Sequence, residues 1–150
     1  MKSNKTLKIL AYISMLPLIF SLFLALYVAL DGPVISSYFM SFARINSYIY
    51  AHSYGALLLA LLAGIQIGQS LQAYDSKYLI FNFSLLGFVW LSYQSFADAL
   101  GVTLLLCCWI AALIIDVNNQ KNLPTWYGNL KIKLNTLVIL ILLILVLVNG

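Results

Sequence analysis

Few side chains in this sequence could carry out chemistry. Its 150 residues include one histidine, His52, two cysteines, four aspartates and no glutamate. A zinc site needs three or four nitrogen, sulfur or carboxylate ligands, and general acid/base catalysis needs positioned titratable groups. Neither set can be assembled here, and no glycine-rich phosphate loop is present. The sequence therefore predicts a protein that is not an enzyme, with no catalytic residue, metal site or cofactor.

His52 is the residue whose type allows the most chemistry. Its imidazole could bind a ligand, a quinone headgroup or a haem iron, although one histidine excludes a bis-histidine haem within the chain. The alternative, which we favour, is a hydrogen-bonded structural residue. Cys107 and Cys108 are adjacent within the apolar run 104–115. We interpret them as small buried hydrophobic residues rather than as a strained disulfide or a soft-metal pair.

The elements that must position these side chains are membrane helices. Hydrophobic residues make up 63% of the chain and charged residues 8%, whereas a soluble domain is about half apolar and a quarter charged. The eight basic residues are scattered between apolar runs, which is typical of topology signals and not of a nucleic-acid-binding surface. Residues 1–150 are therefore predicted to form a single integral membrane domain in contact with the lipid bilayer.

Hydropathy and turn signals predict an all-α bundle of about five transmembrane helices. The approximate spans are residues 9–30, 48–70, 78–92, 97–117 and 130–148. The tight turn between the third and fourth spans predicts an antiparallel hairpin. A cleaved signal sequence is the alternative for the first span, but its apolar run is long for a signal and no clear cleavage site follows.

The basic residues also predict the orientation of the chain. If the N-terminus is inside and the C-terminus outside, seven of the eight basic residues lie on the inner side of the membrane. The inner residues are Lys2, Lys5, Lys8, Lys77, Lys121, Lys131 and Lys133, and the outer residue is Arg44.

All four aspartates fall at ends of the predicted spans. They are Asp31, Asp75, Asp98 and Asp116. A carboxylate at the membrane midplane usually marks a proton relay or an ion site, because its burial in hydrocarbon is costly. We interpret Asp116, near Lys121 and Lys131, as a solvated charge at the interface. A proton-driven pump is therefore disfavoured.

The span 48–70 carries a stripe of small residues. Ala56, Ala60, Gly64 and Gly68 recur every four residues and share one helix face, where a neighbouring backbone could approach closely. We expect this helix at the centre of the bundle, with Gly64 and Gly68 packed against another helix. The last span is the opposite case: residues 137–148 are only leucine, isoleucine and valine, which predicts a peripheral, lipid-facing helix.

A candidate polar site lies on the other side of the same helix. Gly55, which we also assign to helix packing, and Gln66 lie roughly opposite the stripe, and His52 and Tyr54 lie on the same span. Gln66 must find a partner inside the membrane, an interaction worth about 1 kcal/mol. A bond to another helix is favoured over a substrate contact. The partners available for that bond are Asn82, Ser84 and Asn135.

Aromatic residues gather near the predicted span boundaries, where they are expected to anchor the helices at the membrane interface. The outer loop 34–47 contains four large hydrophobic side chains close together. They predict either a segment that lies along the membrane interface or a binding surface. These residues are Tyr38, Phe39, Met40 and Phe42.

Two stretches carry a resemblance to a known family. The first matches at Tyr54, Gly55, Ala56, Leu59, Leu62, Gly64 and Gly68, and the second at Pro124, Trp126, Tyr127, Leu130 and Lys131; Pro17 also fits. These resemble the motifs Tyr-Gly-Ala-x-x-Leu-Ser-Phe-Leu-Gly-Gly-x-His-Trp-Gly and Pro-x-Trp-Tyr-x-x-Leu-Arg of the domain-of-unknown-function 3429 family, the family of transmembrane protein 69. The departures at chemically interesting positions are Ala60 for serine, Ala63 for glycine, Gln66 for histidine and Ile67 for tryptophan.

The resemblance implies a location rather than a reaction. It implies the bacterial inner (cytoplasmic) membrane or the equivalent mitochondrial inner membrane, with several passes through it. Because Gln66 stands where the family motif has histidine, a role that needs an imidazole there is not carried over.

Two classes of function fit these observations. We favour a non-enzymatic accessory, assembly or stability factor for a larger membrane complex, because of the small-residue stripe, the short loops and the missing catalytic set. The alternative class is a small transporter or channel, for which an internal repeat would be expected and none is seen. A quinone-binding redox accessory subunit is a variant of the first class and depends on His52. A membrane-protein partner or a homo-oligomer is expected, and nucleic acid is not.

Overall fold

A computed structural model describes residues 8–9, 11–30, 37–72, 76–94, 99–118 and 125–149, and these ranges contain helices and no strand. The labelled helices are α2 (Leu16–Ala29), α3 (Ser37–Gln72), α4 (Ser76–Gln94), α5 (Ala99–Asn118) and α6 (Thr125–Asn149). Long apolar runs fold this way because a helix satisfies every backbone hydrogen bond within its own segment, as hydrocarbon requires. The predicted all-α class is confirmed.

Four of the helical segments are long and apolar enough to cross a membrane. They are Ala11–Ala29, Tyr38–Gly68, Leu100–Asn118 and Trp126–Val148. The third predicted span, 78–92, lies within α4, which is not among the four. At 19 residues, α4 is about 28 Å long, close to the thickness of a hydrocarbon core.

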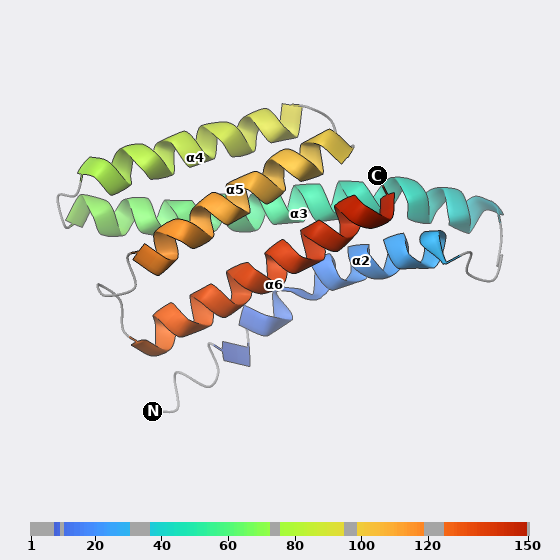
Figure 1. Ribbon diagram of the computed structural model, residues 1–150, viewed down its shortest axis with the longest axis horizontal. Helices are drawn as coiled ribbons and strands as arrows, with labels where there is room; N and C mark the ends of the chain where they lie inside the picture. The colour runs from blue at the N-terminus through green and yellow to red at the C-terminus, as the bar shows by residue number, and fades with distance from the viewer. Residues whose placement is uncertain are drawn as a thin grey trace.

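The helices lie side by side in one elongated bundle (Figure 1). α3 contacts each of the other four, with α2 and α4 covering most of its length. α5 packs on α4 and α6, and α6 also packs on α2. α4 and α5 run in opposite directions (Figure 1), so the predicted hairpin is confirmed. The central position predicted for the helix of residues 48–70 is confirmed as well.

α3 is much longer than the predicted span. It covers 36 residues, or about 54 Å, and includes residues 37–47, which the sequence analysis assigned to an outer loop. That prediction is wrong for these residues because they pack on α2. Ala43 and Ser47 are fully buried, and the Phe39 ring meets the Tyr27 ring edge-on at a centroid distance of 5.3 Å.

The first span is interrupted near its start. A turn at Ser14 and Met15 separates a short helical segment from α2, and Pro17 occupies the first turn of α2, where its missing N–H costs nothing. The Tyr54 hydroxyl of α3 donates a hydrogen bond of 2.7 Å to the carbonyl of Ser14. A side chain of the central helix therefore holds the interruption in place.

α6 has a buried face as well as a lipid-facing one. Val138, Leu142 and Leu145 are fully buried against the neighbouring helices, whereas Leu143 and Leu147 are exposed. The exposed side agrees with the predicted lipid-facing helix, and the buried face was not predicted. A run of similar apolar residues has no pattern that distinguishes its two faces, so the neighbours decide which one is buried.

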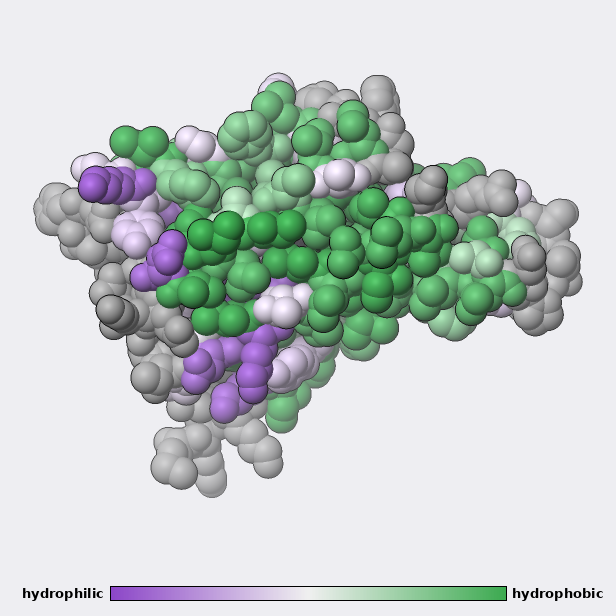
Figure 2. Space-filling model, viewed as in Figure 1, coloured by the Kyte–Doolittle hydropathy of each residue, from purple (hydrophilic) through white to green (hydrophobic). Residues whose placement is uncertain are grey.

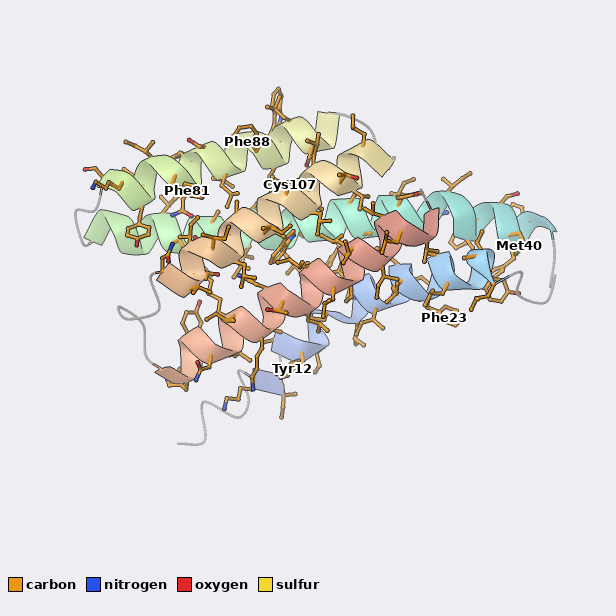
Figure 3. All side chains as sticks on the ribbon, viewed as in Figure 1. Tyr12, Phe23, Met40, Phe81, Phe88 and Cys107 are labelled. Atoms are coloured by element: carbon orange, nitrogen blue, oxygen red, sulfur yellow. The ribbon has the colours of Figure 1, made fainter. Side chains whose placement is uncertain are left out.

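The surface agrees with a membrane environment. Hydrophobic residues cover the middle of the molecule, and hydrophilic residues gather at the end where α4 and α6 begin (Figure 2). The exposed apolar side chains include Phe81 and Phe88 of α4, which line an apolar groove of about 490 Å³ with Cys107 of α5 (Figure 3). Such a surface is stable only against lipid or another apolar surface.

Candidate functional site: a buried polar cluster beside a cavity

Four polar side chains meet inside one end of the bundle. Gln66 lies near the end of α3, Asp116 near the end of α5, and Lys131 and Asn135 in the first half of α6. Lys131 and Asn135 are four residues apart, so they share one helix face. Because α5 and α6 are antiparallel neighbours, the end of one faces the start of the other (Figure 1).

Asp116 accepts a hydrogen bond from each of the other three side chains. Lys131 Nζ lies 2.6 Å from Asp116 Oδ1, and Gln66 Nε2 donates to the same oxygen at 2.5 Å. Asn135 Nδ2 donates to Asp116 Oδ2 at 2.5 Å. The exposed fractions are 8% for Gln66, 3% for Asp116, 6% for Lys131 and 1% for Asn135.

The cluster is electrically balanced. One carboxylate faces one ammonium, and the two amides add donors to the negative charge, which is the arrangement that a buried ion pair needs to offset its desolvation. The interpretation of Asp116 as a solvated interface charge is therefore wrong. The partner of Gln66 is Asp116 and not Asn82, Ser84 or Asn135, although Asn135 bonds the same carboxylate.

A cavity of about 250 Å³ adjoins the cluster. Lys131 and Asn135 form part of its wall, and most of the remaining wall is apolar. The other lining residues are Ala11, Ser14, Met15, Leu58, Leu61, Leu62, Trp109, Trp126, Tyr127, Leu130 and Leu134. The cavity thus lies between the segment preceding α2 and helices α3, α5 and α6.

Two polar atoms of lining residues have no hydrogen-bond partner in the described part of the chain. They are Asn135 Oδ1 and Trp109 Nε1, and both side chains are almost fully buried. A buried polar atom without a partner costs about 1–3 kcal/mol. A ligand or an ordered water that hydrogen-bonds to these atoms would remove this cost.

The three residues of the predicted polar site are not brought together. His52 precedes Gln66 by 14 residues on α3, about 21 Å along the helix axis, and it is buried inside the bundle. Tyr54 bonds to Ser14 instead. Within the described residues, no three histidine, cysteine or acidic side chains are grouped to hold a metal ion.

The small-residue stripe of α3 is only partly covered. Ala56 is buried, Ala60 is half-buried, and Gly64 and Gly68 are exposed. Among the described residues, a Cβ atom at Gly64 or Gly68 would have no atom within 4 Å, apart from the helix's own backbone and chain neighbours. The prediction that these two glycines pack against another helix of this chain is wrong.

Gly55 is the close-packed glycine. A Cβ atom there would lie 2.9 Å from Leu105 Cδ2 and 3.8 Å from Trp109 Nε1. Its absence of a side chain lets α5 approach α3, so the assignment of Gly55 to helix packing is confirmed.

The second family-like motif supplies part of the cavity. Trp126 and Tyr127 are half-buried, with their rings 5.8 Å apart, while Leu130 and Lys131 are buried. Pro124 lies outside the described residues, as do Lys121 and the acids Asp31, Asp75 and Asp98. Cys107 is exposed and Cys108 is buried, and both are free thiols.

Neither the cluster nor the cavity was predicted from the sequence. The available signal was the spacing of Lys131 and Asn135, which places a charge and an amide on one face of an otherwise apolar helix. No family model matches the chain, and no curated protein or solved structure is significantly similar to it. The resemblance to the domain-of-unknown-function 3429 family stays a prediction.

Proposed function

We propose that this chain is a five-span accessory protein that assists the assembly or stability of another membrane protein by binding it, without catalysing a reaction. We place it in the bacterial inner (cytoplasmic) membrane or the equivalent mitochondrial inner membrane, with the N-terminus inside and the C-terminus outside. Membership of the domain-of-unknown-function 3429 family belongs to the same proposal. That family brings no reaction with it.

The proposed topology is supported by the positions of four lysines. Lys8 precedes the first span, Lys77 lies at the start of α4, and Lys131 and Lys133 lie near the start of α6. The starts of α4 and α6 lie at one end of the bundle, and the described start of the chain lies toward the same end (Figure 1). If all five helices cross the membrane, the four lysines are therefore on one side of it. Basic residues concentrate on the inner side of such proteins.

The observation that carries the proposed activity is the uncovered part of the stripe on α3. Gly64 and Gly68 are exposed with open space above them. The stripe continues into a groove of about 330 Å³ between α3 and α4, lined by Ala56, Ala60 and Trp90 among others. Small residues at this spacing let a second helix approach closely enough for backbone and side-chain contacts. The occupant that fits is a transmembrane helix of a partner protein.

The test is a substitution that fills the open stripe without disturbing the bundle. Gly64→Leu should leave the melting temperature in detergent unchanged and abolish recovery of the partner when the tagged protein is purified from native membrane. The matched control is Leu143→Phe, a similar enlargement on the exposed face of α6, which should retain the partner.

Four outcomes decide the proposal. Loss of the partner with Gly64→Leu alone supports it, and loss with both variants or with neither overturns it. If the only species lost is a second copy of the same chain, measured by light scattering in detergent, the stripe serves self-association and the accessory role is wrong.

A further inference from the structure

Asn135 offers an unused acceptor inside the bundle. Its Nδ2 donates to Asp116 Oδ2, which turns Oδ1 away from that carboxylate, and Oδ1 has no partner among the described residues. The side chain is 1% exposed and forms part of the cavity wall. The atom lacks a donor, and the cavity that Asn135 lines is the space beside it from which a donor can approach.

Lys131 offers donors at the same wall. An ammonium group has three N–H donors, and one of them is paired with Asp116 Oδ1. Lys131 also lines the cavity. The Asn135 amide nitrogen and the Lys131 ammonium are thus hydrogen-bonded to the two oxygens of one carboxylate. The unused Asn135 oxygen and the remaining Lys131 donors therefore lie near each other.

The charge balance restricts the kind of ligand. Asp116 already neutralises Lys131, so an anionic headgroup would leave a net negative charge in a mostly apolar site, which is costly. A neutral group that both donates and accepts would satisfy both side chains without this cost. A hydroxyl group has one donor and two acceptor positions.

The rest of the cavity suits a hydrocarbon chain. Leucines from α3 and α6 line it, and one of them, Leu61, is more than half exposed, so the cavity opens on the surface of the bundle. Trp126 and Tyr127, which stand at the hydrophilic end of α6, form another part of the wall. Aromatic side chains of this kind prefer the headgroup level of a membrane.

We propose that this cavity binds a neutral lipid through a hydroxyl group of its head, which donates to Asn135 Oδ1 and accepts from Lys131 Nζ. The hydroxyl could come from a glyceride lipid or from a quinol, which share this chemistry. This inference is independent of the proposed partner helix, because the cavity and the α3 stripe are formed by different residues.

Tryptophan fluorescence reports directly on the cavity. The chain has three tryptophans, and two of them, Trp109 and Trp126, line it. Trp90 lies in the groove between α3 and α4, so the experiment uses the Trp90→Phe protein in dodecyl maltoside micelles. The probe is a monoacylglycerol with a dibrominated chain, because bromine quenches nearby tryptophan.

The proposal predicts that the headgroup of the brominated probe determines how tightly the probe binds. The brominated monoacylglycerol should quench with saturable binding, whereas the brominated methyl ester without a hydroxyl, and the brominated fatty acid anion, should bind at least about tenfold more weakly. Displacement by unbrominated monoacylglycerol or by a short-chain quinol then identifies the source of the hydroxyl. Equal quenching by all three brominated probes overturns the proposal.

Two variants and one control assign the binding to this cavity. Asn135→Leu removes the acceptor, and Ala11→Phe fills the cavity while leaving the polar cluster intact, so a folding defect of the first does not decide the test. Both should lose saturable quenching. Asn82→Leu is the matched control, because Asn82 is an equally buried asparagine of α4 with an unpartnered Oδ1 that does not line the cavity. Retained binding by Ala11→Phe, or loss by Asn82→Leu, overturns the assignment.

Discussion

Lys131 Nζ lies 2.6 Å from Asp116 Oδ1, and this ion pair joins α6 to α5 with both side chains buried. A buried pair adds little over a well-packed apolar pair, but removal of one partner leaves an uncompensated charge in the interior. We therefore expect the pair to specify which residues of α5 and α6 face each other more than to raise the free energy of unfolding.

Removal of one charge of the Asp116–Lys131 pair should strongly destabilise the protein. We expect Lys131→Met to lower the free energy of unfolding by about 3–5 kcal/mol, measured by denaturation in mixed micelles. Lys133→Met is the control, because Lys133 is exposed on the same helix. The double variant Asp116→Asn/Lys131→Met should recover part of the loss, since it leaves no unpaired charge. A double variant as unstable as the sum of its parts would contradict the pairing.

Replacement by leucine should change stability at the enclosed glycine of α3, Gly55, and not at the open glycine, Gly64. Gly55→Leu is expected to lose about 1–3 kcal/mol by overpacking, because its side chain would collide with the fully buried Leu105. Gly64→Leu enters open space and should leave the melting temperature in detergent unchanged. If Gly64→Leu is the more damaging variant, the face of α3 that packs inside the chain has been assigned wrongly.

The hydroxyl of Tyr54 should have a measurable effect on stability. Tyr54→Phe removes the hydrogen bond to the Ser14 carbonyl and is expected to cost about 0.5–1.5 kcal/mol. Tyr50→Phe, which alters an exposed tyrosine one turn earlier on the same helix, serves as the comparison and should cost less. Hydrogen exchange at residues 11–20 should rise only in Tyr54→Phe, and unchanged exchange there would show that the bond does not hold the interruption.

The number of membrane crossings can be measured with reporter fusions. If α4 crosses the membrane, alkaline phosphatase fused after Gly150 should be active and a cytoplasmic fluorescent reporter at the same site should be dark. Fusions after Gln72, the last residue of α3, and after Gln94, the last residue of α4, should differ in the same way. Identical results at these two positions would show that α4 does not cross.

Sequence alone determined the class of this protein and much of its outline. The long apolar runs of α5 and α6 predict membrane helices, because in lipid a helix satisfies the hydrogen bonds of its own backbone. Residues 48–70 contain enough small side chains to predict a central helix. The hairpin of α4 and α5 followed from the short turn between two apolar runs.

Tertiary structure alone decided where the polar groups meet. Gln66, Asp116 and Lys131 are separated by 50 and 15 residues along the chain, and a span end in sequence looks the same whether water or another helix covers it. Polar groups of α3 and α6 replace water at Asp116 of α5. α5 also encloses Gly55 of α3, whereas no described neighbour covers Gly64. Burial depends on which surfaces come together, and apolar runs without a distinct face do not encode that choice in their local pattern.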